Sequence, residues 1–280
     1  MKRYPKYKNS GVQWLGDIPE HWEVKKLAFF GKFLKGSTIS KSDLVDNGLP
    51  VILYGDIYTK YTIKVNNIIN FISQELANTS KPIYKDDILF TGSGETREDI
   101  GKCIVYLGDS KAYTGGDILI FRQNINDSLF ISYFLNSNYA IFQKATNSRG
   151  DVIVHIYSSS LRNISVTIPP LEEQKQIASF LDEKIEKINQ YISNKQRLIE
   201  LLKEQKTAII NHVVTKGLNP DAPMKPSGIE WLGDIPEGWE VKRAKYYFYE
   251  VDERSESGTE ELLSVSHINV SSTELKNGRR

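Results

Sequence analysis

The sequence lacks the cysteines and the histidine spacing that mark disulfide-bonded and zinc-binding proteins. Cysteine occurs once, at position 103, so no disulfide can form within the chain. Because Cys103 lies in the apolar run 103–107, we expect a small buried side chain and not a reactive thiol. The four histidines are scattered without the spacing of metal ligands, and one cysteine cannot support a structural zinc site. We therefore predict no metal in this chain.

Neither the net charge nor the hydropathy of the chain points to nucleic acid or a membrane as its partner. The 36 Lys and Arg residues nearly balance the 35 Asp and Glu residues, for a formal charge of +1, so any basic surface must be local. The basic start of the chain is not followed by an apolar segment, and no run is long enough to span a bilayer. A cytoplasmic location is the expectation. With 40% apolar residues in 280, the chain can build one sizeable core and fill two structural units.

No catalytic motif stands out. The glycine-rich segment 91–96 lacks the Gly-Lys-Ser/Thr ending of a phosphate-binding loop, so a tight connection is the better interpretation. The carboxylate pairs Asp86-Asp87 and Glu98-Asp99 are adjacent in sequence and point apart in an extended chain. The elements do not alternate regularly as strand and helix, which disfavours a doubly wound nucleotide-binding sheet. We expect no catalytic residue, and a nuclease or methyltransferase acting alone is disfavoured.

An internal repeat organises the chain. Residues 10–26, SGVQWLGDIPEHWEVKK, recur as residues 227–243, SGIEWLGDIPEGWEVKR, at a constant offset of 217. Thirteen of the seventeen positions are identical, two of them tryptophan. So long a period indicates two whole domains in tandem. Trp14 and Trp22 are expected to anchor the edge of a core. The sequence thus predicts one complete module and the start of a second, cut short.

A long helix is predicted between the two copies. Pro169 and Pro170 favour a helix that begins near Leu171, with acidic residues 172 and 173 at the positive end of its dipole. No Gly or Pro interrupts the segment until Gly217, which suits a C-cap. Such a helix of about 45 residues would be roughly 65 Å long, too long to pack only on its own domain.

Apolar residues follow a heptad pattern along this helix, with Lys195 and Lys206 at two steps of the seam. The other faces mix basic and acidic residues, which is typical of a solvated coiled-coil exterior. The seam predicts pairing with another helix through Ile177, Leu181, Ile185, Ile188, Ile192, Ile199, Leu202, Ile209 and Val213.

The segment before the helix has mixed character. Short β-like runs cover 51–54, 88–90, 102–107, 118–121 and 164–168, and residues 128–146 have helical character with Asp127 or Ser128 as the cap. The fold class is therefore α+β: a mixed domain, then a long coiled-coil-forming helix, then the start of a second domain.

Three segments of this domain are predicted loops rich in aromatic and hydrogen-bonding side chains. They run through 54–61, 93–97 and 147–155. Arg and Lys can meet phosphates or guanine edges, and Asn or Ser can pair with other base edges, although the same composition is ordinary for solvated loops. The candidate DNA-contacting residues are Tyr58, Lys60, Ser93, Thr96, Arg97, Asn147, Arg149 and His155.

Four strings resemble a known family. The chain is similar to the specificity subunits of type I restriction-modification systems in the segments 18–22 (IPEHW), 54–57 (YGDI), 85–89 (KDDIL) and 168–174 (IPPLEEQ), the last leading into 177–182 (IASFLD). The entry of the Pro-Pro-Leu-x-Glu-Gln string into a long helix is the most specific of these signals. The tandem duplication independently fits the same family.

The resemblance implies a domain plan and a set of partners. Residues 1–168 would form the first target-recognition domain, 169–216 the helical spacer, and 217–280 a linker with the truncated start of a second recognition domain. Each domain would bind one half of a split site in double-stranded DNA. The spacer would dock modification subunits, which hold S-adenosylmethionine, and through them the restriction subunit; the chain itself would bind no cofactor.

Our hypothesis for a chain of this length is that two copies pair through their helical seams to recognise a symmetric split site. One alternative remains open from the sequence: a coiled-coil scaffold, or an inactive truncated fragment without DNA specificity.

Overall fold

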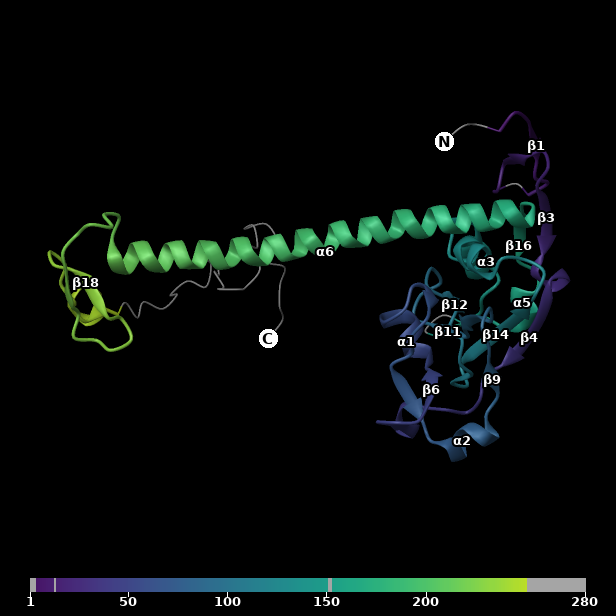
Figure 1. Cartoon of the computed structure of the whole chain (residues 1–280), viewed down its shortest axis with the longest axis horizontal. Coiled ribbons are helices and arrows are strands. Elements are labelled where there is room, and N and C mark those ends of the chain that lie inside the picture. Colours follow the sequence, from purple (N-terminus) through teal and green to yellow (C-terminus); the bar gives the residue numbers. More distant parts are fainter. Residues whose placement is uncertain (1–3, 13, 151–152, 251–280) are drawn as a thin grey trace, which may run out of the picture. The chain divides into compact units, whose positions relative to one another are not determined.

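The computed structural model describes residues 4–12, 14–150 and 153–250 (Figure 1). The chain divides into two compact units, residues 1–194 and 195–280, and the long helix α6 contributes to both. The first unit combines sheets with short helices, as the α+β prediction requires. No helix in the described ranges is both long and apolar enough to cross a membrane.

Two five-stranded sheets form the body of the first unit. One has the order β4-β14-β10-β12-β7 and the other β5-β8-β6-β13-β9. Neighbouring strands are antiparallel except for the pairs β12–β7 and β13–β6. The strands of the first sheet are β4 (Gly31–Lys35), β7 (Ile63–Val65), β10 (Ile88–Thr91), β12 (Cys103–Tyr106) and β14 (Ile118–Gln123). Those of the second are β5 (Leu44–Val45), β6 (Leu49–Ile52), β8 (Asn70–Ile72), β9 (Pro82–Ile83) and β13 (Ala112–Thr114).

Short pairs and helices complete this unit. The two-stranded pairs are β1 (Tyr7–Asn9) with β2 (Asp17–Pro19), β3 (Glu23–Lys26) with β16 (Ser165–Ile168), and β11 (Ser93–Gly94) with β15 (Val154–His155). The helices are η1 (Leu27–Phe29), η2 (Lys41–Asp43), α1 (Tyr54–Thr59), α2 (Gln74–Thr79), α3 (Ser128–Leu135), α4 (Asn138–Thr146), α5 (Ser158–Leu161) and the start of α6.

The first sheet separates two apolar cores. On β10, Ile88 and Phe90 belong to the core that includes Phe130 and Leu135 of α3, whereas Leu89 belongs to the other core. Successive side chains of a strand point to opposite faces, so a central strand covered on both sides is continuously apolar. All four residues of β12 are buried for the same reason. Cys103 is among them, as predicted, and burial raises the pKa of its thiol to about 11.

Several predicted elements are confirmed and two are wrong in detail. Strands lie at 88–91, 103–106, 118–123 and 165–168, close to the predicted runs. Residues 54–59, however, form α1, although Tyr54 was expected to end a strand and the following residues to form a loop. The predicted helix 128–146 is two helices: Asn136 is the C-cap of α3, and its side chain bonds the backbone N and O of Cys103 on β12.

The long helix α6 (Leu171–Lys216) begins and ends where the sequence predicts. Gly217 has φ +77° and its N donates to Val213 O at 3.0 Å, which is the left-handed C-cap expected of glycine. At 46 residues and 1.5 Å per residue, α6 is roughly 69 Å long.

The first turns of α6 are fixed to the first unit by the residues of its entry motif. Gln174 is 2% exposed; its Oε1 accepts from Asp127 N at 2.9 Å and its Nε2 donates to Pro169 O at 2.9 Å. Asp182 accepts from Tyr133 Oη of α3 at 2.7 Å and also pairs with Lys64. Figure 1 shows α3 beside this end of α6. The strings at 168–174 and 177–182 therefore have a structural role.

The second unit repeats the N-terminal hairpin of the first. We call β1 and β2 with the turn that ends at Trp22 the first hairpin, and β17 (Met224–Pro226) and β18 (Asp234–Pro236) with the turn that ends at Trp239 the second hairpin. Their registers coincide at the offset of 217: Tyr7 opposes Pro19, and Met224 opposes Pro236. Ile18 and Ile235 are each 4% exposed. A short helix follows each hairpin, η1 in the first unit and η3 (Ala244–Tyr246) in the second. The rest of the predicted second domain, 251–280, lies outside the described residues.

Candidate nucleic-acid interface

Four of the predicted DNA-contacting residues come together where β11 pairs with β15. Ser93 Oγ and His155 Nδ1 lie 2.9 Å apart across this pair. The backbone of Arg149 is bonded in both directions to that of His155, with N to O distances of 2.9 and 2.7 Å. Tyr58 Oη on α1 donates toward Ser93 O at 2.9 Å. Residues from three separate segments thus form one cluster.

Tyr58 holds this cluster together. Its hydroxyl also lies 2.8 Å from Thr91 Oγ1 and 3.1 Å from Asp99 O. Burial raises the pKa of Tyr58 to about 12, so the phenol stays protonated and acts as a hydrogen-bond donor near neutral pH. A hydroxyl with its only proton committed to backbone oxygens positions the loop 93–99. Its contribution to DNA contact would be indirect.

The remaining residues of the two polar loops are exposed around the cluster. Thr96 Oγ1 donates to Asp99 Oδ2 at 2.9 Å, which closes the 96–99 turn, and Arg97 is exposed within that turn. Asn147 Nδ2 donates to Gln143 O at 2.7 Å and so ends α4. Arg149 has an exposed side chain. Of this group, the two arginines have the reach and charge for a groove or a phosphate.

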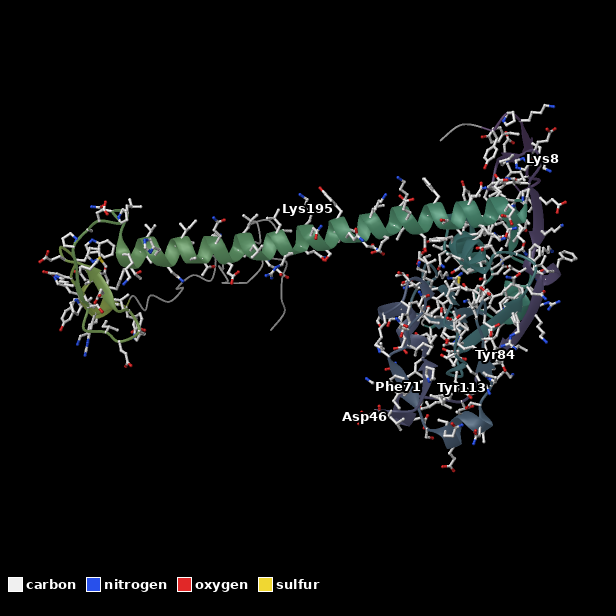
Figure 2. All side chains as sticks on the ribbon, viewed as in Figure 1. Lys8, Asp46, Phe71, Tyr84, Tyr113 and Lys195 are labelled. Atoms are coloured by element: carbon white, nitrogen blue, oxygen red, sulfur yellow. The ribbon has the colours of Figure 1, made fainter. Side chains whose placement is uncertain are left out.

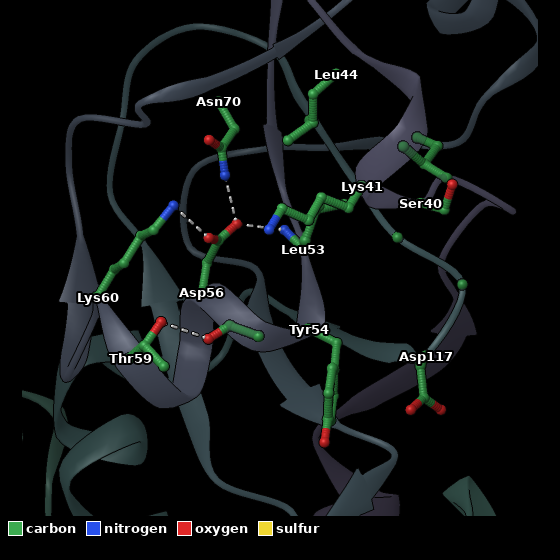
Figure 3. Close-up of a pocket in the computed structure, with 14 residues that line it drawn as sticks. Ser40, Lys41, Leu44, Leu53, Tyr54, Asp56, Thr59, Lys60, Asn70 and Asp117 are labelled. Carbon is green, nitrogen blue, oxygen red and sulfur yellow. Dashed lines mark hydrogen bonds and ion pairs between the residues drawn. The ribbon is translucent and has the colours of Figure 1, made fainter.

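Lys60 lies apart from that cluster, at a cavity of about 520 Å³ between α1 and the β13–β14 turn. Its Nζ is 2.8 Å from Oδ1 of Asp56, which is 6% exposed and also accepts from Asn70 Nδ2 and Leu53 N, each at 2.8 Å. Figure 3 shows Lys60 and Asn70 converging on this carboxylate. Asp56 is thus paired with a cation and accepts two further hydrogen bonds, so its role in the cavity wall is structural.

A second cavity of about 400 Å³ meets the first at Gly116 and Asp117, which line both. Its other walls include His155, Lys35 of β4 and Tyr157, which is 54% exposed. We call the two cavities together the Gly116 strip. It joins Lys60 to His155 and adds three basic or aromatic residues that the sequence did not single out: Lys35, Lys41 and Tyr157.

The Gly116 strip carries basic and aromatic side chains suited to nucleic acid, beside the carboxylates of Asp56 and Asp117. Lys35 and Lys41 are exposed and can approach phosphates, while Tyr54 and Tyr157 offer ring faces and hydroxyls. The backbone must pass close at the turn: a Cβ built on Gly115 would lie 2.9 Å from Ile39 O, so no larger residue fits there without a shift. Glycine at 115 thus allows the turn that joins the two cavities to lie close to Ile39.

The predicted helix-pairing residues fall into three groups. Ile177 packs against the core of the first unit and Leu181 lines a groove there. Ile185 and Val213 are partly buried, and the others are exposed large apolar side chains: Ile188, Ile192, Ile199, Leu202 and Ile209, at 47–56%. Figure 2 shows side chains projecting along α6, with Lys195 labelled. Ile210, 48% exposed, lies on the same face but was not predicted.

Comparison with known protein families identifies relatives of this chain. Residues 19–202 match the family model for the type I restriction modification DNA specificity domain. The chain is 29% identical over 229 residues to the type I restriction enzyme MjaVIII specificity subunit of Methanocaldococcus jannaschii, with 81% of this chain and 49% of the relative covered. It is 30% identical over 237 residues to the putative MjaX specificity subunit of the same organism, with 81% and 52% covered. The chain thus spans about half the length of these relatives.

The fold has a counterpart among solved structures. A chain from a structure of the type I R-M system, described in terms of complex assembly and conformational transition, aligns with a TM-score of 0.54 and 18% identity, covering 76% of this chain and 49% of that chain. The fold is therefore shared over the aligned part of the chain. With two thirds of its residues matched by the family model, the chain belongs to the type I restriction-modification DNA specificity family.

Proposed function

We propose that this chain is a non-catalytic specificity subunit that binds one half of a bipartite DNA site through its first unit. The observation that carries this proposal is the Gly116 strip, where exposed Lys35 and Lys41, two tyrosines and the Ser93–His155 cluster adjoin. Family membership supports DNA as the ligand. Residues 1–168 would be the target-recognition domain, in the cytoplasm where its DNA is found.

The long helix would act as the spacer and docking element of this assembly. Modification subunits would bind along α6, hold S-adenosylmethionine and carry out methylation, and the restriction subunit would join through them. We also propose that two copies pair antiparallel through the exposed seam, because the seam has five apolar residues about half exposed and no covering element in the described ranges. Such a pair would recognise a symmetric split site. Light scattering at micromolar concentration tests the pairing, and a stable monomer would contradict it.

Selection from a randomised duplex pool tests DNA recognition. The chain, with and without its cognate modification subunit, would be incubated with the pool at fixed salt and the retained DNA sequenced. An enriched motif is the expected result, and its symmetry reports whether one or two copies bind. No enrichment in the presence of the partner would favour the alternatives, a coiled-coil scaffold or an inactive fragment.

The strip itself is tested with two lysines of one strand. Lys35 lines the strip, whereas Lys32, also exposed on β4, does not. Lys35→Ala should weaken binding to all sequences alike and reduce the salt slope by about one, as expected for one lost phosphate contact. Lys32→Ala is the matched control and should leave the slope unchanged. Equal effects of both substitutions would exclude the strip as the phosphate-binding surface.

The arginines report on sequence readout. If Arg149 forms a bidentate contact with a base, Arg149→Ala should cost about 1–3 kcal/mol and relax the enriched motif at one position. The same experiment on Arg97 distinguishes the two loops. A uniform loss across all sequences would instead assign that arginine to a phosphate.

A further inference from the structure

The two hairpins have the same fold but different partners. In the second unit, the second hairpin holds the last turn of α6. A Cβ built on Gly217 would lie 3.5 Å from Trp239 Cζ2 and 3.6 Å from Pro236 Cγ, and Lys216 Nζ donates to Asp234 O. The end of one helix is therefore seated on three residues of the second hairpin.

The first hairpin presents the same three residues to an open groove. Asp17, Pro19 and Trp22, which correspond to Asp234, Pro236 and Trp239, line a mostly apolar groove of about 500 Å³. Its opposite wall comes from α3 and the start of α4, with Phe134 and Tyr139, the latter 46% exposed. We call this the first-hairpin groove.

Hydrogen bonds within the hairpins show how closely the two copies match. Ser10 N donates to Gly16 O at 3.1 Å, and its counterpart Ser227 N donates to Gly233 O, also at 3.1 Å. The bond from Trp22 N to Pro19 O is 2.9 Å, and the equivalent bond from Trp239 N is 2.8 Å. A surface built identically should accept the same ligand when its other walls permit it.

We infer that the first-hairpin groove binds the last turn of α6, including Lys216 and Gly217, from a second copy of this chain. This inference rests on the proposed antiparallel pairing of α6. Two equal helices that pair antiparallel bring the last turn of each beside the first turn of the other, and Leu181 in the first turns of α6 lines the groove. The occupant is thus specified by the geometry of the pair.

In this arrangement, the second hairpin competes with the first hairpin of a second copy for the end of α6. It already holds Lys216 and Gly217 within its own chain, so the first hairpin of a second copy must displace it. The second hairpin therefore limits pairing, and the same substitution at repeat-related positions has opposite effects. Trp22→Ala weakens pairing because it removes the groove wall, whereas Trp239→Ala strengthens it because it frees the helix end.

Sedimentation of the full-length variants measures this opposition. Trp22→Ala should lower the association constant about tenfold or more, as expected for loss of a central aromatic contact, and Trp239→Ala should raise it several-fold. A change of the same sign in both variants would overturn the inference. If the parent pairs and neither variant changes the constant, the inference fails while the pairing of α6 stands. If no variant pairs, both fail.

Crosslinking provides a test that does not depend on Trp22, whose indole also donates to Glu173 Oε1 at 3.2 Å. Chains that carry Asp17→Cys are mixed with chains that carry Lys216→Cys, and a short bis-maleimide is added; native Cys103 is fully buried. A crosslinked heterodimer is expected, and Trp239→Ala in the second chain should increase its yield. Glu204→Cys in place of Lys216→Cys is the control: Glu204 is exposed, points away from the seam and lies twelve residues before Lys216, so it should crosslink poorly. Paired chains that do not crosslink at 17 and 216 would refute the groove as the docking site.

Discussion

Replacement of one seam leucine on α6 tests the pairing of two copies most directly. Leu202 is 52% exposed and lies on the predicted seam, whereas its neighbour Leu201 is 44% exposed and lies 100° further around the helix, away from the seam. Complete burial of a leucine contributes about 1.5–3 kcal/mol, so the exposed half of Leu202 contributes about 1 kcal/mol when covered. In a two-fold pair the contact occurs twice. Leu202→Ala should therefore cost about 2 kcal/mol and raise the dissociation constant roughly 30-fold.

Leu201→Ala is the matched control, since it removes the same atoms from the same turn of the helix. Alanine has the highest helix propensity, so neither substitution should unfold α6, and circular dichroism checks this. Sedimentation velocity over a concentration series gives the dissociation constants. The expected result is a clear shift for Leu202→Ala and less than a threefold change for Leu201→Ala. An equal or larger effect of Leu201→Ala would refute the seam as the pairing face.

Three further predictions concern the stability of the first unit. Arg122 donates from Nε and Nη2 to Asp87 at 2.8 and 2.6 Å, and Asp87 is 2% exposed. Arg122→Ala should lower the free energy of unfolding, measured in urea, by about 3 kcal/mol, because a buried carboxylate loses its cationic partner. A loss below about 1 kcal/mol would contradict this. Burial lowers the pKa of Lys144, whose Nζ donates to Gly101 O at 2.7 Å. Between this lowered pKa and about 10.5, the pKa of a lysine in the unfolded chain, only the unfolded chain keeps the proton on Lys144. The free energy of unfolding should therefore rise with pH over that range. Lys144→Met should abolish that rise, and a Met variant with the parent's pH profile would assign it to another group. Cys103 should resist alkylation at pH 8 in the folded chain and react on unfolding, and modification at the same rate in both states would show that the core opens.

The elements that the sequence predicts well are those determined by local chemistry. The start of α6 after Pro170 and its end at Gly217 depend on residues within one turn of each boundary. Buried strands such as β10 and β12 are recognisable as short apolar runs. The break between α3 and α4 could not be predicted, because Asn136 forms its hydrogen bonds with β12, more than 30 residues away in the chain.

The candidate site follows the same division. The polar loops could be recognised by composition, and the structure brings Tyr58, Ser93 and His155 together. Lys35 and Lys41 escaped notice because each is an isolated lysine in an ordinary segment. They belong to the site only because the β13–β14 turn at Gly116 lies between their two cavities. A surface assembled from segments distant in sequence has no local signature.

The repeated hairpin separates what a sequence determines locally from what its surroundings determine. The same string forms the same register and the same turns in both units, with Gly11 and Gly228 at φ +74° and +75°, so the hairpin needs no particular neighbour to fold. Burial of its outward side chains differs, however: Trp14 packs against Tyr139 and Phe142, whereas its counterpart Trp231 is 84% exposed. The hairpin thus keeps one backbone structure against different partners. The exchange of partners inferred above for a second copy therefore requires no refolding of either hairpin.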